Sequence, residues 1–327
     1  MNYWELLQHT SRTFYLSIRN LPAEAGNALC LAYLMLRVSD YLEDTQSLPP
    51  QEKVRLLNLW QAVIAGDASI AELEQAISDT PANGEADYRA AASARQILHG
   101  LHQLPPELED QITRHVRNST DGMARWVSRG PDVRTEADMD DYMHEVAGRV
   151  GYLSTEVFAF HSPLVRARME RLMTVARETG LALQTVNIIR GLRKDYERGW
   201  IYVPESFCSR AGITREQLFD PAHRDEAMQV LETLVAKAER HLQAAVRYIL
   251  LLPRGAYRIR QACMWPILFA VRTVAFSRGN PGVFTGDVKV PRKEIKRIVR
   301  NSTLCGWSNT LVKCYARHLQ RRPRSTR

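Results

Sequence analysis

Helical periodicity is the sequence feature that most restricts the fold of this chain. Apolar residues recur at three- and four-residue intervals over long stretches, and alternating, β-branched strand patterns are nearly absent. Loop-forming residues fall between these stretches. We therefore expect an all-α protein with helices at about 23–44, 51–65, 87–101, 106–128, 138–161, 164–197, 222–251, 255–277 and 291–320.

The organisation of the chain points to a single domain. None of the 327 residues lies in a low-complexity stretch of the kind that links domains. A helix-rich chain of this length without repeats predicts one bundle around a central apolar cavity. We expect that domain to cover 1–327, with a basic C-terminal arm at about 289–327.

The basic residues are concentrated in that arm. Residues 289–327 carry 12 Lys/Arg and one acid, Glu294, whereas the first 288 residues have a net charge of −3. Such an arm suits anionic lipid, a cofactor phosphate or nucleic acid, and it also suits a solubilising tail. No nucleic-acid-binding motif accompanies it, so no nucleic acid partner is expected.

Cysteines and apolar runs bear on the location of the protein. The five cysteines are scattered and form no CxxC pair, which argues against a zinc module or a disulfide framework and fits a reducing compartment. The N-terminus lacks a signal pattern, and the best apolar run, from Met264 to Phe276, is too short to span a membrane and contains Arg272. We expect a cytoplasmic protein, with peripheral contact at a membrane surface.

The first acidic constellation follows a buried helical stretch. Asp40 and Asp44 are one helical turn apart, with Glu43 beside them and Arg37 one turn earlier. Carboxylates held this close repel each other unless a cation compensates, and Mg²⁺ is a hard ion that prefers oxygen ligands. Acid pairs on helices are also common on solvated faces. The apolar residues before this pair favour an interior site.

A second polar stripe occurs at 184–195. Asn187, Gly191 and Asp195 are spaced at i, i+4 and i+8 on one helical face. Asn187 and Asp195 offer two oxygen ligands, whereas Gly191 offers none and leaves space. Arg190 and Arg193 are suited to phosphate oxygens. The alternative is the polar outer face of an amphipathic helix.

Together, these segments resemble the squalene/phytoene synthase family over roughly residues 8–300. The first acidic constellation is similar to that family's first aspartate-rich motif in its squalene-synthase form. The motifs that carry the resemblance are Ser11-Arg-Thr-Phe14, Tyr33 to Asp44, Tyr142 to Gly151, Gln184 to Arg190 and Asn280 to Val290.

The resemblance implies an isoprenoid-synthase fold in which magnesium clamps a prenyl diphosphate, with farnesyl diphosphate as the expected substrate. It assigns metal binding to Asp40, Glu43, Asp44, Asn187 and Asp195. It assigns substrate binding to Ser11, Arg12, Phe14, Arg37, Gln184 and Arg190. Tyr142 is the expected catalytic tyrosine, acting with Asp40 and Asp44, and Lys289 lies in the segment expected near NADPH. Phe14, Phe158 and Phe160 are candidate linings of an apolar cavity that keeps water from the allylic cation.

Three positions depart from the family pattern. Gly191 stands where the family has an aspartate, Lys194 where a second acid is common, and Trp200 where a loop arginine precedes Tyr202-Val-Pro204. If water occupies the place of the missing carboxylate, Gly191→Asp should tighten magnesium binding. The alternative is that the second half-site has lost a metal.

The leading hypothesis is condensation of two farnesyl diphosphates to presqualene diphosphate and NADPH-dependent reduction to squalene. One rival is a single-substrate terpene cyclase or diphosphate-releasing hydrolase, because Asn187-x₃-Gly191-x₃-Asp195 is similar to the metal triads of class I terpene cyclases. The other is a non-catalytic relative of the family. The intact Arg37, Asp40, Asp44 and Tyr142 argue against a non-catalytic relative.

Overall fold

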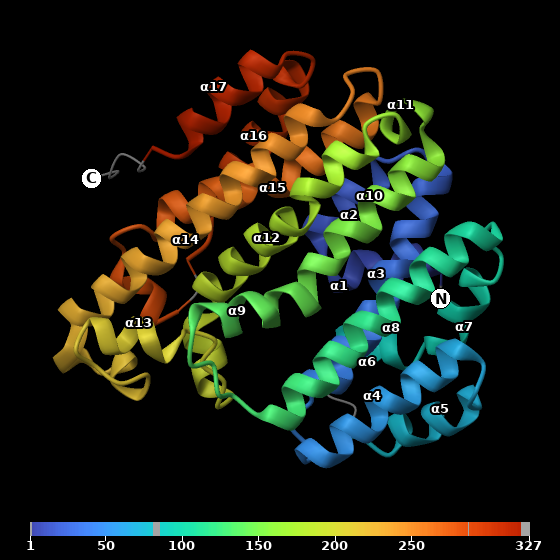
Figure 1. Ribbon diagram of the computed structural model, residues 1–327, viewed down its shortest axis with the longest axis horizontal. Helices are drawn as coiled ribbons and strands as arrows, with labels where there is room; N and C mark the ends of the chain where they lie inside the picture. The colour runs from blue at the N-terminus through green and yellow to red at the C-terminus, as the bar shows by residue number, and fades with distance from the viewer. Residues whose placement is uncertain (1, 81–85, 287, 322–327) are drawn as a thin grey trace. The chain divides into compact units, whose positions relative to one another are not determined.

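The computed structural model describes residues 2–80, 86–286 and 288–321, and over these ranges every regular element is a helix and none is a strand (Figure 1). The all-α prediction is confirmed. The chain forms two compact units: unit 1 is Met1–Gly130 with Tyr152–Arg166, and unit 2 is Pro131–Gly151 with Ala167–Arg327. The expectations of one domain over 1–327 and of a central cavity stay predictions.

Unit 1 contains the N-terminal helices and most of α10. Its elements are α1 (Tyr3–Thr10), α2 (Arg12–Arg19), α3 (Ala23–Asp44), α4 (Pro50–Ala65), α5 (Ile70–Ser78), α6 (Ala86–Ala91), α7 (Ala94–Leu101), α8 (Pro106–Arg129), α10 (Arg149–His161) and α11 (Pro163–Arg166).

Helix α3 is the core of unit 1. It begins directly after Pro22, is rich in Ala and Leu, and ends where Thr45 turns to an extended conformation with ψ 123°. Fifteen of its 22 residues are buried, and it contacts α1, α4, α6, α7 and α8. Because α3 is surrounded along its length, the acids at its C-terminal end are held on a rigid element.

Unit 2 contains the remaining helices. Its elements are α9 (Glu136–Met143), the π-helix η1 (His144–Gly148), the first turn of α10, α12 (Met169–Glu197), α13 (Glu205–Arg210), η2 (Glu216–Phe219), η3 (Pro221–His223), α14 (Arg224–Leu251), α15 (Tyr257–Ser277), η4 (Pro281–Phe284), α16 (Arg292–Cys305) and α17 (Asn309–Leu319).

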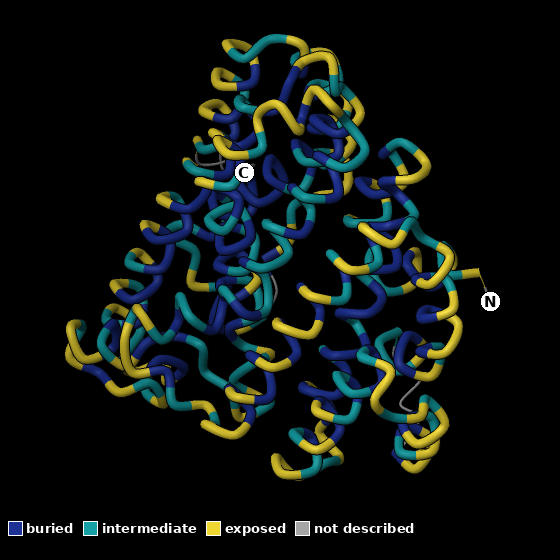
Figure 2. The backbone as a smooth tube through the Cα atoms, turned by 45° about the vertical axis from the view of Figure 1, so that its right-hand side comes forward, coloured by how far each residue is buried: buried dark blue, intermediate teal, exposed yellow. Residues whose placement is uncertain are grey.

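Helices α12, α14 and α15 form the core of unit 2 and lie side by side (Figure 1). Buried residues run in stripes along the helices, and exposed residues gather at loops and helix ends (Figure 2). Helix α12 ends just before Gly199, whose φ of 80° is a left-handed conformation that glycine adopts without strain. This turn directs the chain into the Trp200–Pro204 segment.

Three glycines allow η1 and the start of α10 to cross α12 at backbone contact. A Cβ on Gly151 would lie 2.0 Å from the Ala176 carbonyl oxygen, and one on Gly180 would lie 2.1 Å from the Ala147 carbonyl oxygen. A Cβ on Gly148 would lie 2.7 Å from the imidazole Nδ1 of its own helix's His144. Only glycine fits this crossing, which lies just after Tyr142 in the chain.

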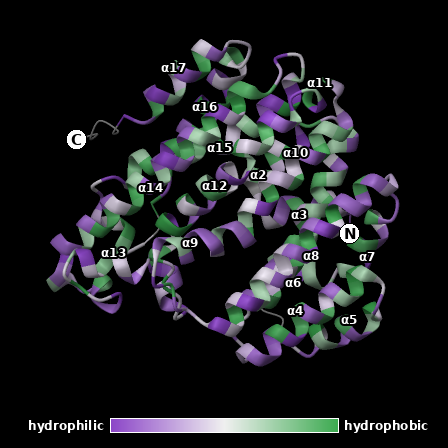
Figure 3. Ribbon diagram, in the orientation of Figure 1, coloured by the Kyte–Doolittle hydropathy of each residue, from purple (hydrophilic) through white to green (hydrophobic). Residues whose placement is uncertain are grey.

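The basic arm folds onto α15 as α16 and α17, along which hydrophilic residues recur (Figure 3). The guanidinium of Arg260, which is fully buried, joins these helices to the ends of α14 and α15. It donates to the carbonyl oxygens of Gly306 at 2.8 Å and Leu252 at 2.8 Å, and to the side-chain oxygen of Asn309 at 2.6 Å. The described part of this arm is thus an ordered element.

The observed helices agree with the expected ones in most of their bounds. Three expected helices are each broken in two, at residues 92–93, 167–168 and 306–308, and the one at 138–161 contains the π-turn. Helices α1, α2, α5 and α13 were not expected. No helix among the residues that the structure covers has the length and apolar character needed to cross a bilayer.

Candidate active site

The acidic end of α3 is organised by Arg37. Its Nη1 donates to Asp40 Oδ2 at 2.7 Å, while Nε and Nη2 both donate to Asp87 Oδ1 at 3.0 Å and 2.8 Å. Asp87 comes from α6, fifty residues along the chain, and sequence reasoning missed it. Arg37 is therefore held between two carboxylates, with one face of its guanidinium group near the Tyr33 ring, 5.9 Å from its centre.

The N-terminal motif lies beside this cluster. The Ser11 side chain accepts a hydrogen bond from the backbone N–H of Phe14 at 3.2 Å and so caps α2. The Phe14 ring lies 5.6 Å from the Tyr33 ring, and the Ser11 hydroxyl hydrogen-bonds Tyr33. Ser11 and Phe14 are thus brought to Arg37 through Tyr33. The side chain of Arg12, predicted to bind substrate, lies outside the described part of the chain.

The three carboxylates of α3 differ in environment. Burial, reinforced by the negative charges of Asp44 and Asp87 and opposed by Arg37, raises the pKa of Asp40 to about 6. Glu43 is only 7% exposed and its Oε1 has no hydrogen-bond partner. Burial, Asp44 and Asp40 raise the pKa of Glu43 well above its usual value, with Lys53 opposing. Asp44 is exposed.

This end of α3 therefore holds an excess of negative charge. The charges of Asp44 and Asp87 add to the burial that raises the pKa of Asp40, and the charges of Asp44 and Asp40 add to the burial that raises the pKa of Glu43. Within the described ranges, however, no three His, Cys, Asp or Glu side chains converge closely enough to hold a metal ion by themselves. A cation here would need further oxygen ligands from water or from a phosphate, which is the usual coordination of Mg²⁺.

In unit 2, α12 presents the second polar stripe. Asn187 is exposed and its Nδ2 donates to Gln184 Oε1 at 3.3 Å. The space beside Gly191 borders the Asp195 carboxylate: a Cβ there would lie 2.8 Å from Asp195 Oδ2. A side chain at position 191 would therefore require the Asp195 carboxylate to shift, and the expectation that Gly191→Asp tightens magnesium binding stays a prediction.

The charged residues of α12 are distributed around this stripe. Arg190 is half-buried and Lys194 is exposed. Arg193 is paired with Glu197, Nε to Oε1 at 2.7 Å, and its guanidinium lies 5.6 Å from the Tyr196 ring centre. Arg190 is thus the better placed of the two arginines for a ligand on the face of Asn187.

Tyr142 belongs to an aromatic stack. Its ring is buried against that of Tyr202, with centres 4.5 Å apart and planes 19° apart. The Trp200 ring also stacks with that of Tyr202, with centres 5.7 Å apart and planes 21° apart. Tyr142 is also next to Met143, whose sulfur accepts a hydrogen bond from Thr185 of α12 at 3.3 Å. Trp200, which departs from the family pattern, is therefore part of the aromatic stack that contains the expected catalytic tyrosine.

Three other expected residues, Phe158, Phe160 and Lys289, lie on segments other than the acidic end of α3, the polar stripe of α12 and the aromatic stack of Tyr142. Phe158 is buried in unit 1 and Phe160 is half-buried. Lys289 is exposed in the segment between η4 and α16. Its assignment to a cofactor site stays a prediction.

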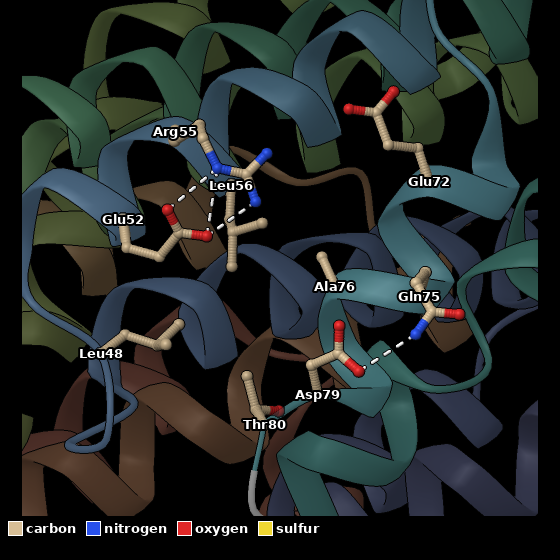
Figure 4. Close-up of a pocket in the computed structure, with 9 residues that line it drawn as sticks. All are labelled: Leu48, Glu52, Arg55, Leu56, Glu72, Gln75, Ala76, Asp79 and Thr80. Atoms are coloured by element: carbon tan, nitrogen blue, oxygen red, sulfur yellow. Dashed lines mark hydrogen bonds and ion pairs between the residues drawn. The ribbon is translucent and has the colours of Figure 1, made fainter.

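A pocket of about 410 Å³ lies in unit 1, between α4 and the end of α5 (Figure 4). Glu52 and Arg55 are ion-paired at 2.7 Å on one side of it, and Gln75 donates to Asp79 at 3.0 Å on the other (Figure 4). None of the residues that line it is an expected site residue. Four of its polar side chains are thus paired with one another.

Comparison with known proteins agrees with the motifs. The family model described as squalene/phytoene synthase matches residues 7–294. Squalene synthase of Homo sapiens is 29% identical over 304 residues, covering 92% of this chain and 69% of the relative. Squalene synthase of Schizosaccharomyces pombe is 28% identical, covering 91% of this chain and 64% of the relative.

Solved structures give the same picture. TcSQS in complex with the ligand BPH1237 superposes with a TM-score of 0.84 at 26% identity, covering 99% of this chain and 92% of that one. A dehydrosqualene synthase with a ligand superposes with a TM-score of 0.66 at 18% identity, covering 97% and 95% of the two chains, a likeness of fold.

Proposed function

The chain belongs to the squalene/phytoene synthase family, whose members are prenyltransferases, and from this premise we propose that it joins two farnesyl diphosphates head to head. The proposed product is presqualene diphosphate, reduced with NADPH to squalene. The observation that carries the proposal is the acidic end of α3, where the half-buried Asp40 and the buried Glu43 lie among the charges of Asp44, Asp87, Arg37 and Lys53.

The donor set fits magnesium. The unpartnered, buried Oε1 of Glu43 and the raised pKa of Asp40 are what carboxylates experience when a compensating cation is needed. Asp40, Glu43 and Asp44 would hold an ion in unit 1, and Asn187 and Asp195 would hold another in unit 2. When bound, Mg²⁺ neutralises the charge that develops on a departing diphosphate.

The protein's own groups account for the other requirements of the reaction. Arg37, fixed by Asp40 and Asp87, and Arg190 are assigned to phosphate oxygens. A guanidinium held in advance stabilises developing negative charge without reorganising when the bond breaks. Tyr142 is assigned to proton transfer and to guiding the carbocation, with its ring orientation fixed by Tyr202. NADPH is assigned to the segment that contains Lys289.

Product analysis tests the proposal. The purified protein is incubated with farnesyl diphosphate and Mg²⁺, with and without NADPH, and the products are separated by chromatography and mass spectrometry. We expect presqualene diphosphate without NADPH, squalene with it, and no turnover with EDTA. A cyclic fifteen-carbon product would instead identify a single-substrate cyclase, and farnesol would identify a hydrolase. This single-substrate enzyme is the second candidate because of the glycine at position 191.

A matched pair of variants tests the metal assignment. Asp40→Asn removes one carboxylate charge from the cluster but keeps the shape of the side chain, so turnover should fall at least about 100-fold. Asp67→Asn makes the same change at an exposed acid outside the cluster and should leave turnover unchanged. Equal activity of both variants would exclude Asp40 from the metal site.

A further inference from the structure

The turn between α16 and α17 exposes three large apolar side chains. Leu304 is 72% exposed, Trp307 57% and Leu311 51%, and together they form what we call the apolar tip. Elsewhere in the described ranges, only two other large hydrophobic residues are exposed, Leu16 and Leu164. Scattered single apolar residues are normal on a surface, whereas three within eight residues of one turn are a concentrated patch.

The apolar tip is held rigidly in this exposed position. The Trp307 ring stacks on the Tyr257 ring with centres 3.9 Å apart and planes 5° apart. The Tyr257 hydroxyl donates to the Thr303 carbonyl oxygen, and Arg260 donates to the Gly306 carbonyl oxygen at 2.8 Å. The turn is therefore fixed from below by the start of α15, and its apolar residues are directed outward by ordered structure.

Positive charge surrounds the apolar tip. Arg300 is exposed one helical turn before Leu304 on α16, and Arg254 is exposed in the turn that leads to Tyr257. The pKa of Arg260 below the tip is lowered to about 10 by burial and by the charges of Arg254 and Arg168. The single acid of the arm, Glu294, is ion-paired with Arg272 at 2.5 Å and with Arg297 at 2.9 Å. The residues that flank the tip are thus basic, and the one acid of the arm is ion-paired.

We propose that the apolar tip enters the interfacial layer of an anionic membrane while the surrounding arginines contact lipid phosphates. Trp and Leu prefer this layer, and basic residues at its edge are attracted to negatively charged headgroups. Nucleic acid fits the same charge but gives Leu304 and Leu311 nothing to contact, and one face of Trp307 is already covered by Tyr257. The inference goes beyond the proposed function and does not depend on it.

Vesicle co-sedimentation of the full chain tests the proposal without any isoprenoid substrate. Binding is measured to vesicles of phosphatidylcholine with phosphatidylglycerol and to vesicles of phosphatidylcholine alone, at low and high salt. We expect binding to the anionic vesicles that weakens as salt rises, and little binding to the neutral ones.

Two matched pairs of variants separate the apolar tip from the charge. Leu304→Ser should weaken binding about 10-fold, because an apolar side chain no longer enters the lipid, whereas Leu164→Ser, 54% exposed in unit 1, should not. Arg254→Glu should weaken binding about 20-fold, since two units of charge are lost, whereas the same change at the exposed Arg117 should have no effect.

Several outcomes would overturn the proposal. These are absence of binding to anionic vesicles at low salt, equal affinities for Leu304→Ser and Leu164→Ser, and equal affinities for neutral and anionic vesicles. A dimer in analytical ultracentrifugation that Leu304→Ser dissociates would also overturn it, because the apolar tip would then be an interface between copies of the chain. Circular dichroism and thermal unfolding of each variant ensure that the comparison is between folded proteins.

Discussion

At the scale of single residues, the neighbours of a carboxylate determine where it can lie, as Asp195 on α12 illustrates. Asp195 lies against the hydrogen of Gly191, so the glycine decides where this carboxylate sits on α12. An aspartate at position 191 would bring a second carboxylate against the first, and Gly191→Asp is now expected to displace Asp195. The position of the Asp195 carboxylate therefore depends on the absence of a side chain at Gly191.

Gly191→Ala tests this coupling with the smallest possible change. The new methyl group would lie 2.8 Å from Asp195 Oδ2, so the carboxylate must rotate away. We expect a higher Mg²⁺ concentration for half-maximal activity, while the free energy of unfolding in urea stays level or rises by up to about 1 kcal/mol, since alanine favours a helix over glycine. Lys194→Ala at the exposed neighbouring position is the control. Unchanged Mg²⁺ dependence in both variants would show that the position of Asp195 is irrelevant to catalysis.

Residues of the candidate site were predictable from sequence where they share a helix. Asp40 and Asp44, or Asn187 and Asp195, lie on one face because helical spacing requires it. Asp87 was not predictable, because its contact with Arg37 joins residues fifty positions apart and no local pattern marks it. The same holds for the stacking of Tyr202 on Tyr142, which depends on how the segment after α12 returns to α9.

At the scale of elements, long helices were predicted well and their interruptions were not. Helix α3 was predicted with its exact bounds, because Pro22 and the loop from Thr45 to Pro50 mark both ends of an apolar stretch. The break before α17 and the π-turn after α9 occur within continuous helical periodicity. In both places, contacts with other helices determine the backbone conformation. Arg260 donates a hydrogen bond to the Gly306 carbonyl oxygen, and η1 crosses α12 at backbone contact. Periodicity carries no information about such contacts.

Gly180→Ala tests the crossing of η1 and α12. Its methyl group would meet the Ala147 carbonyl oxygen at 2.1 Å, and backbone cannot rotate away as a side chain can. We expect the free energy of unfolding to fall by about 3 kcal/mol or more, the upper range for overpacking. Gly286→Ala, where a Cβ meets nothing within 4 Å, should change it by less than about 1 kcal/mol. Similar urea midpoints for the two variants would contradict the close crossing.

At the scale of the whole molecule, two buried arginines, Arg260 and Arg272, join the last two helices to α15 and to the end of α14. Arg260 donates hydrogen bonds to acceptors at the end of α14 and in the turn between α16 and α17. These hydrogen bonds offset the free-energy cost of burying its charge. The basic residues between positions 292 and 319 are thereby kept on helices. Net charge alone predicted an arm but could not predict that it folds onto α15.

Arg260→Lys tests the contribution of Arg260. A lysine keeps the charge but cannot direct donors along the fork of a guanidinium, so buried acceptors lose their partners. We expect a loss of about 3 kcal/mol or more of unfolding free energy and faster hydrogen exchange in 292–319 than in the core of α15. Arg247→Lys, exposed on α14, is the matched control. Unaltered exchange in α16 and α17 would show that other contacts hold them.

The glycine crossing also bears on how chains of this kind are recognised. A metal-binding acid can be lost where water or a neighbouring ligand compensates, and this chain has Gly191 where the family pattern has an aspartate. No substitution compensates for a Cβ that would lie 2.0 Å from a carbonyl oxygen, as at Gly151. The spacing of Gly148, Gly151 and Gly180 is therefore a signature of the architecture that should persist in relatives that have lost the chemistry, whereas the acids report the chemistry itself.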